Sequence, residues 1–181
     1  MIYEPKEDSF LLEKAVRKYS KGKSFLDMGS GSGIQAKAAL ENKAKSVLAA
    51  DISEEAVRNL KKQKISAIKS DLFSKIKDKF DIIALNPPYL PEDAREDKES
   101  QLATTGGKKG DEIILKFLKQ AKSHLNKKGI ILLVVSSLTP KRKILELLMK
   151  QNLKKEAILS EKFFFETLEV WKIEEMRNKQ V

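Results

Sequence analysis

The feature that most restricts the fold is a glycine-rich turn between a short apolar segment and an alanine-rich one. The turn spans residues 29–33 and reads Gly-Ser-Gly-Ser-Gly, with a strand-like segment at 24–28 before it and a helix-like segment at 34–42 after it. Glycine allows a tight turn and lets a ligand approach the main chain closely. A strand, such a turn and a helix in this order predict a ligand site at the carboxyl end of the first strand of an α/β sheet.

The rest of the chain continues this alternation of strand-like and helix-like segments. The 181 residues suit one domain over 1–181, and no repeat or long linker divides them. We therefore predict an α/β fold with a largely parallel sheet. The expected strands are 24–28, 46–50, 65–69, 80–85, 130–136, 153–159 and 167–173, and the expected helices are 6–19, 34–42, one capped by Ser53, 111–125 capped by Asp111, and 140–149.

Acidic residues follow the first three expected strands or lie in them. Asp27 precedes the turn, Asp51 ends the second strand about 20 residues beyond it, and Asp71 follows the third, with Leu72 beside it. A carboxylate at Asp27 would repel a pyrophosphate but would attract the sulfonium and amino groups of S-adenosylmethionine. Asp51 then suits the ribose hydroxyls, Asp71 the adenine amino group and Leu72 the ring. The alternative is that Asp51 and Asp71 are ordinary turn residues at strand ends.

A second motif, Asn86-Pro87-Pro88-Tyr89, follows the fourth expected strand at the same edge of the sheet. Two prolines make a stiff, extended segment without N–H donors. The side-chain carbonyl of Asn86 and the main-chain carbonyl of Pro87 then form two fixed acceptors for a planar NH2 group. Tyr89 offers a flat face for a planar substrate. These residues predict methyl transfer to an amide or amino nitrogen by positioning and electrostatics.

Composition excludes several other kinds of site. The chain has no cysteine and one histidine, so we expect neither disulfides nor a metal site. No segment resembles a signal peptide or a membrane span, and a cytoplasmic protein without membrane contact is expected. The net charge of +10 suits an acidic partner, but the lysines are spread along the chain, which favours a solvated surface.

Together these motifs resemble the class I methyltransferases that carry an Asn/Asp-Pro-Pro-Tyr/Phe motif. The opening segment 3–12, the Gly-Gly-Lys-Lys-Gly segment at 106–110 and Glu166-Thr167-Leu168 are similar to HemK-like enzymes of the eukaryotic and archaeal branch. The resemblance implies a Rossmann-like class I methyltransferase fold with a seven-stranded, mostly parallel sheet, helices on both faces and a C-terminal antiparallel hairpin. It also implies methylation of the glutamine side-chain amide (N5) in the Gly-Gly-Gln motif of a class I peptide-chain release factor.

The resemblance further implies site residues and a partner. The cofactor would be lined by Ser9, Asp27, Gly29, Gly31, Asp51, Asp71, Leu72 and Asn86, and the glutamine would be held by Asn86, Pro87, Pro88 and Tyr89. Enzymes of this branch commonly pair with a small zinc-binding activator protein at a sheet edge. The third expected strand, Ile65–Lys69, is that edge here, and a bare edge can accept a partner strand. A short edge guarded by lysines is the competing interpretation.

Other functions stay open at this point. A nucleic-acid N-methyltransferase acting on adenine-N6 or guanine-N2 fits the same motif, and the basic charge favours it mildly. It lacks support from any added recognition domain. A non-catalytic scaffold that binds adenosylmethionine would not need the Asn86–Tyr89 motif. The polar segment Leu90–Gly110 is expected to be a functional loop. Phe163–Phe165 are expected to be a core-filling loop between the last two strands, and an exposed patch for a substrate or partner is the alternative. Trp171 is expected to lie in the core.

Overall fold

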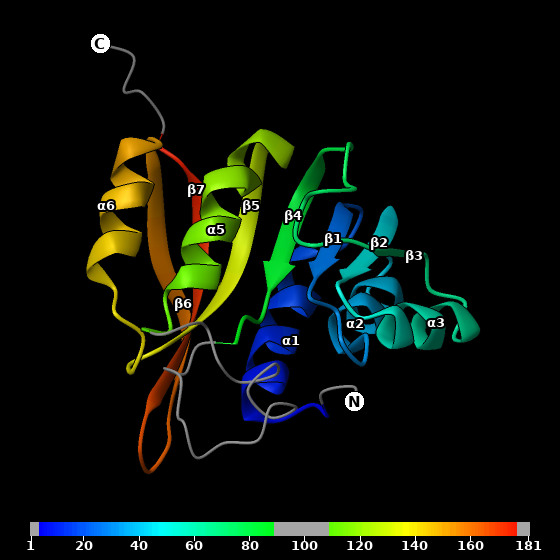
Figure 1. Cartoon of the computed structure of the whole chain (residues 1–181), viewed down its shortest axis with the longest axis horizontal. Coiled ribbons are helices and arrows are strands. Elements are labelled where there is room, and N and C mark those ends of the chain that lie inside the picture. The colour runs from blue at the N-terminus through cyan, green and yellow to red at the C-terminus, as the bar shows by residue number, and fades with distance from the viewer. Residues whose placement is uncertain (1–3, 89–108, 177–181) are drawn as a thin grey trace.

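The structure is a computed structural model that describes residues 4–88 and 109–176. Its helices lie between strands, in the order that the sequence predicts (Figure 1). The helices are α1 (Glu7–Tyr19), α2 (Ile34–Glu41), α3 (Glu54–Lys62), α5 (Glu112–Ala121), the 3-10 helix η1 (Lys122–His124) and α6 (Arg142–Lys150). The strands are β1 (Ser24–Met28), β2 (Ser46–Asp51), β3 (Ala67–Lys69), β4 (Phe80–Leu85), β5 (Leu125–Ser136), β6 (Leu153–Lys162) and β7 (Thr167–Glu175).

The described strands form one seven-stranded sheet in the order β3-β2-β1-β4-β5-β7-β6. Strands β1 to β5 pair in parallel, and β7 runs antiparallel to both of its neighbours. This arrangement confirms the predicted mostly parallel sheet with a C-terminal antiparallel hairpin. The chain reverses its order along the sheet at β1 and β4, and such a switch point is where open α/β sheets bind ligands.

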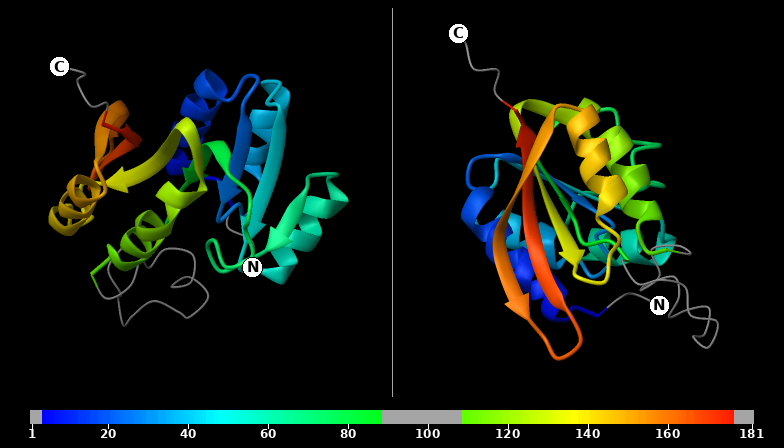
Figure 2. Two further views of the ribbon diagram at one scale, coloured as in Figure 1. Left: turned by 90° about the horizontal axis from the view of Figure 1, so that it is seen from above. Right: turned by 90° about the vertical axis from the view of Figure 1, so that its left-hand side faces the viewer.

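Alternation of side chains along each strand gives the sheet two apolar faces. One face packs under α5 and α6, and the other packs under α1, α2 and α3, so the sheet is the middle layer (Figure 2). The largest buried side chain is Trp171, which is 0% exposed and lies in the cluster under α5 and α6. The prediction that Trp171 belongs to the core is therefore confirmed.

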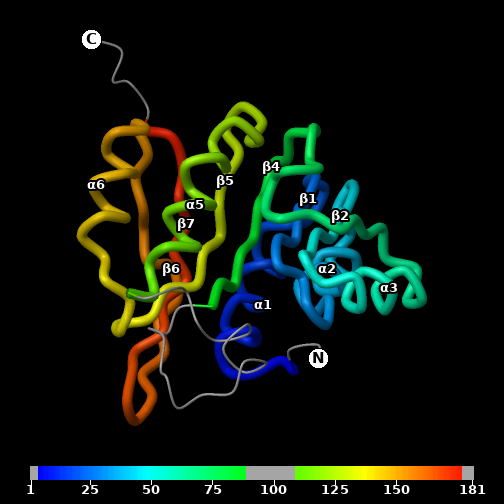
Figure 3. Tube along the Cα trace, in the orientation of Figure 1, coloured from blue at the N-terminus to red at the C-terminus, as the bar shows by residue number. Residues whose placement is uncertain are grey.

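The carboxyl ends of β1, β2 and β4 meet at one edge of the sheet. The tube trace shows the turns that follow these strands gathered at that edge (Figure 3). Strand β6 runs parallel to β5 because both are antiparallel to β7, so the β6–β7 hairpin also lies at this edge. In the described part of the chain, no helix is long and apolar enough to cross a membrane.

The structure corrects several predicted boundaries. Strand β3 starts at Ala67 rather than Ile65, because Ile65 is buried with Leu60 of α3. Strand β5 begins at Leu125, where a helix was expected, because Leu125 pairs with Phe80 of β4. Strand β7 continues beyond residue 173, its expected end, to Glu175, since β6 pairs with Glu174 and Glu175.

Three local predictions can be compared with the structure: the one for Ser53 is confirmed, and those for Asp111 and for Phe164 and Phe165 are corrected. Ser53 caps α3 as expected, and its hydroxyl accepts a hydrogen bond from the Ala56 amide at 3.3 Å. Asp111 occupies the N-cap position of α5 without a side-chain capping bond. Phe164 and Phe165, expected in the core, are 93% and 84% exposed. They form the tip of the β6–β7 hairpin, where neither layer of helices reaches them.

Candidate active site

The glycine-rich turn is built as its sequence requires. Gly29, Gly31 and Gly33 have φ angles of 64°, 49° and 82°, in the left-handed region that glycine tolerates. A Cβ at Gly33 would lie 2.3 Å from a methyl of Leu60, so this position also needs glycine for packing. The Gly29 amide donates to the Ala50 carbonyl at 2.8 Å. The main chain of the turn is therefore held close to the end of β2.

Asp51 joins the turn to the end of β2. One of its carboxylate oxygens accepts from the Gly31 amide at 2.8 Å, and the other accepts from the Ser53 amide at 2.8 Å. The side chain is only partly buried. An acid so placed can keep one main-chain bond and still present an oxygen to a ligand hydroxyl over the turn.

Asp27 lies at the end of β1 and is 2% exposed. Its carboxylate accepts a hydrogen bond from the Ala36 amide in the first turn of α2 at 3.0 Å. Burial raises the pKa of Asp27 to about 7, the Ala36 bond opposes this rise, and the charge of Asp51 adds to it. A buried acid with so high a pKa is poised to respond to a positively charged ligand.

Asn86 follows β4 and faces the start of α1. Its amide nitrogen donates to the Ser9 hydroxyl at 3.4 Å, and the Ser9 hydroxyl donates to the Asp8 carboxylate at 3.1 Å. Because Ser9 gives its only hydroxyl proton to Asp8, its oxygen is left to accept from Asn86. This chain turns the amide nitrogen of Asn86 toward Ser9 and its carbonyl oxygen the other way.

The carbonyl oxygen of Asn86 is the most informative atom in the site. Within the described residues it is buried and has no hydrogen-bond partner. An unpaired buried acceptor costs about 1–3 kcal/mol, so it needs an explanation. At the carboxyl edge of the sheet, the simplest explanation is a ligand that donates a hydrogen bond to it.

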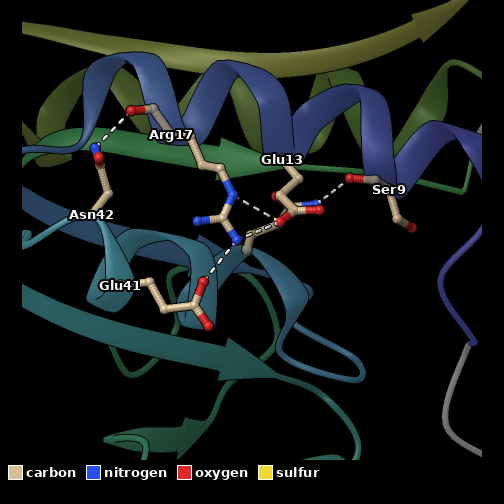
Figure 4. A network of polar contacts seen from close by, with 6 residues as sticks. Ser9, Glu13, Arg17, Glu41 and Asn42 are labelled. Carbon is tan, nitrogen blue, oxygen red and sulfur yellow. Dashed lines mark hydrogen bonds and ion pairs between the residues drawn. The ribbon is translucent and has the colours of Figure 1, made fainter.

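Helix α1 is fastened so that Ser9 keeps its place. Gln35 of α2 donates to the Ser9 carbonyl at 2.8 Å, and Asn42 donates to the Arg17 carbonyl at 2.6 Å (Figure 4). The Arg17 guanidinium bonds Glu13 within α1 and reaches Glu41 of α2 at 2.7 Å. These contacts link α1 to α2 near both ends of α1. They fix the distance between Ser9 and the glycine-rich turn that precedes α2.

Asp71 and Leu72 lie one strand further along the sheet. The Asp71 carboxylate is exposed and forms an ion pair with the Lys116 ammonium group at 2.9 Å. Leu72 is partly buried, has a φ angle of 47°, and packs on the core under α5. Asp71 would have to exchange Lys116 for an adenine amino group, and its role stays a prediction.

Of the remaining predicted site residues, the structure describes Pro87 and Pro88 but not Tyr89. Pro87 is buried and Pro88 is partly buried, directly after Asn86. Tyr89 and most of Leu90–Gly110 lie outside the described residues. No group of three or more His, Cys, Asp or Glu side chains in the described ranges is arranged to hold a metal ion.

Two polar residues of this site were missed by the sequence interpretation. Asp8 is 5% exposed and Gln35 is 4% exposed, although both are polar. Their only signal in the sequence is position, since Asp8 precedes Ser9 and Gln35 lies among the alanines after the turn. Neither pattern distinguishes a buried polar group from a surface one, because α1 and α2 bring them together only in the fold.

A seven-stranded sheet of this order, with acids and a glycine turn at its switch point and an Asn-Pro-Pro segment after β4, defines a class I methyltransferase. Comparison with known proteins agrees. Residues 7–168 match the family described as Methyltransferase small domain, and the chain belongs to that family. The resemblance to HemK-like methyltransferases is likewise confirmed by the individual relatives.

The relatives include proteins that span nearly the whole chain. A Methanocaldococcus jannaschii protein with the provisional name protein N5-glutamine methyltransferase is 37% identical, over 93% of this chain and 89% of its own. Human methyltransferase HEMK2 is 28% identical over 94% of this chain and 88% of its own. The release factor glutamine methyltransferase of Streptococcus pneumoniae is 37% identical over 62% of this chain, which spans only 45% of that longer protein.

Solved structures show the same fold. The complex of Mtq2 and Trm112 from E. cuniculi, described as responsible for methylation of the translation termination factor eRF1, matches with a TM-score of 0.77. The match has 24% sequence identity and covers 97% of this chain and 99% of the solved one. At this identity the match supports the fold.

Proposed function

We propose that this chain uses S-adenosylmethionine to methylate the side-chain amide nitrogen of a glutamine, in the Gly-Gly-Gln motif of a class I peptide-chain release factor. The names of the Methanocaldococcus, human and streptococcal relatives support the reaction and the substrate. Release factors act in translation, so we expect the enzyme in the cytoplasm.

The observation that carries the proposal is the buried carbonyl oxygen of Asn86, which has no hydrogen-bond partner among the residues that the structure describes. A glutamine amide has two N–H donors on a planar nitrogen. One donor can satisfy this oxygen, and the main-chain carbonyl of Pro87 is the natural acceptor for the other. With both protons held, the nitrogen has one orientation, with its lone-pair face toward the methyl donor.

The residues at the strand ends fit S-adenosylmethionine. When bound, it supplies an electrophilic methyl group on a positively charged sulfur. Asp27 matches the positive charge of its amino-acid portion and would repel a phosphate, and the lack of side chains at Gly29 and Gly31 lets the ligand approach the main chain closely. Asp51 would accept from the ribose hydroxyls, Asp71 from the adenine amine, and Leu72 would cover the ring, while Ser9 and Asn86 would close the site from the α1 side.

The protein's own contribution is orientation and charge. An amide nitrogen is a weak nucleophile because its lone pair is delocalised into the carbonyl. Two acceptors that draw positive charge from its protons favour the state in which that lone pair attacks carbon. As the new N–C bond forms, the C–S bond of the methyl donor breaks and leaves its electron pair on sulfur, and the nitrogen then loses a proton to water. Asp8 and Ser9 position Asn86, and Tyr89 is proposed to pack on the substrate amide.

We also propose a small activator protein at the edge strand. The expected segment was Ile65–Lys69, and the pairing edge that the structure describes is β3, Ala67–Lys69, which has only β2 as a partner in the described sheet. The pairing of Mtq2 with Trm112 supports such a partner. The zinc-binding character of the activator is part of this proposal.

The test is methyl transfer from labelled S-adenosylmethionine. Substrates are a release factor, its Gln→Asn variant in the Gly-Gly-Gln motif, and RNA and DNA, each with and without the activator. We expect label on the wild-type factor alone. Asn86→Ala should abolish it, whereas Asn59→Ala, a partly buried asparagine on α3, should not. Label on nucleic acid alone would replace the proposal with nucleic-acid N-methylation.

A further inference from the structure

The β6–β7 hairpin ends in two phenylalanines that are exposed to solvent. Phe163 donates its amide proton to the Glu166 carbonyl at 2.7 Å, which leaves Phe164 and Phe165 as the two central turn residues. Neither residue has a positive φ angle, so the backbone does not require glycine here, but exposed turns usually carry polar residues. The rings are 93% and 84% exposed and contact each other edge to face, with centroids 4.7 Å apart.

The base of this hairpin is held firmly. The Ser137 amide donates to the Thr167 carbonyl at 2.8 Å, and the Thr167 amide donates to the Ser137 hydroxyl at 3.0 Å. On the other side, Glu161 forms an ion pair with Lys14 of α1 at 3.5 Å. The hairpin is thus tied both to the end of β5 and to the helix that carries Ser9. A rigidly held apolar tip loses little entropy when it binds a partner.

The tip lies at the edge of the sheet that carries the site. Strand β6 is parallel to β5, so the hairpin follows the carboxyl end of β6 as Asn86 follows that of β4. Figure 1 shows the hairpin extending past the carboxyl ends of the central strands. A large molecule whose reactive group reaches Asn86 would pass beside this tip.

The charges near the tip favour protein over nucleic acid. Residues 160–167 contain Glu161, Glu166 and a single Lys162. A surface that stacks on bases normally combines its aromatic residues with cations for the phosphates. Together with Lys14, which pairs with Glu161, the tip has no net positive formal charge, in a chain whose net charge is +10.

We infer that Phe164 and Phe165 form a docking point for the protein substrate, and that they insert into an apolar pocket next to the glutamine-bearing loop. The inference rests on the proposed function, since it assigns a second contact to the substrate of the same site. Aromatic residues, phenylalanine among them, are enriched in protein–protein interfaces relative to the rest of the surface.

The experiment compares the full-length wild-type protein with F164A/F165A, with activator present if methylation requires it. We expect KM for the release factor to rise about tenfold or more, as for a lost interface anchor. The value of kcat at saturating substrate, the Kd for S-adenosylmethionine and the Tm should stay unchanged. F164L/F165L should recover much of the lost affinity. Met149→Ala is the matched control, because Met149 is 66% exposed but lies in the last turn of α6 at the opposite edge.

Each other outcome overturns the inference. An unchanged KM in F164A/F165A means that the tip does not dock the substrate. A clear drop in Tm or loss of cofactor binding means that the rings serve folding. A wild-type dimer that the variant converts to a monomer assigns the tip to self-association, and a raised KM for nucleic acid alone assigns it to bases. If the wild type labels no release factor, the proposed function fails first and the inference falls with it.

Discussion

Replacing Asp27 with asparagine should separate stability from cofactor binding. Burial raises the pKa of Asp27 from its ordinary value of 3.8 to about 7. The folded protein therefore keeps this proton up to about pH 7, whereas the unfolded chain loses it near pH 3.8. The stability linked to the proton is fully present below pH 3.8 and is lost as the pH rises through about 7.

The magnitude follows from the size of the shift. One pKa unit corresponds to about 1.36 kcal/mol. A shift of about three units therefore lowers the free energy of unfolding by about 4 kcal/mol at a pH where Asp27 is ionised in both the folded and the unfolded protein. About 2.5 kcal/mol of this is lost between pH 5 and pH 8. In the Asp27→Asn variant the side chain never ionises and can still accept from Ala36. Relative to the wild type, the free energy of unfolding of the variant should therefore rise by about 2.5 kcal/mol between pH 5 and pH 8.

Urea unfolding at pH 5 and pH 8 measures the stability gain, and calorimetry with S-adenosylmethionine measures binding. At pH 8 the variant should bind the cofactor about 10- to 100-fold more weakly, because it lacks the negative partner for the positive groups of the ligand. Wild-type binding at pH 6 should release about one proton, and variant binding should release none. A stability difference that stays constant with pH would refute the reasoning about Asp27.

Three further predictions follow from the same geometry. Asn86→Ala should reduce methyl transfer about 100-fold or more, and Tm should be maintained or rise, since the variant removes a buried acceptor that has no partner in residues 4–88 and 109–176. An active variant would contradict the role of Asn86. Gly33→Ala should lower the free energy of unfolding in urea by about 2–4 kcal/mol, because of its φ angle of 82° and the clash with Leu60. The control Gly22→Ala, with a φ angle of 69° but open space around it, should lower it by about 1–2 kcal/mol, and equal losses would refute the packing argument. Burial alone would raise the pKa of Asp81, but hydrogen bonds, led by the one from the Ser24 amide, hold it below its ordinary value. Asp81→Ala should therefore lower Tm at pH 7, and the difference in Tm should disappear as the pH falls through the pKa of Asp81; a difference that does not change with pH would contradict this account.

The architecture was predictable because its signals are local. The turn at 29–33 lies between a strand and a helix, and apolar runs such as 80–85 mark buried parallel strands. The positions of Asp27, Asp51 and Asn86 at strand ends followed from these same patterns, since the carboxyl ends of parallel strands share one edge. The ends of β3, β5 and β7 were not predictable, because a strand continues wherever a neighbour offers hydrogen bonds, and that neighbour is distant in sequence.

The sequence alone therefore determined the fold class, the sheet edge proposed for the cofactor and the candidate Asn-Pro-Pro acceptors. Only the tertiary structure decided how these groups are oriented. The contact between Asn86 and Ser9 joins residues 77 positions apart, and it sets which way the Asn86 carbonyl faces. Likewise, the exposure of Phe164 and Phe165 depends on how far β6 and β7 extend beyond the helices. Burial and hydrogen-bond direction are properties of packed surfaces, so no local pattern encodes them.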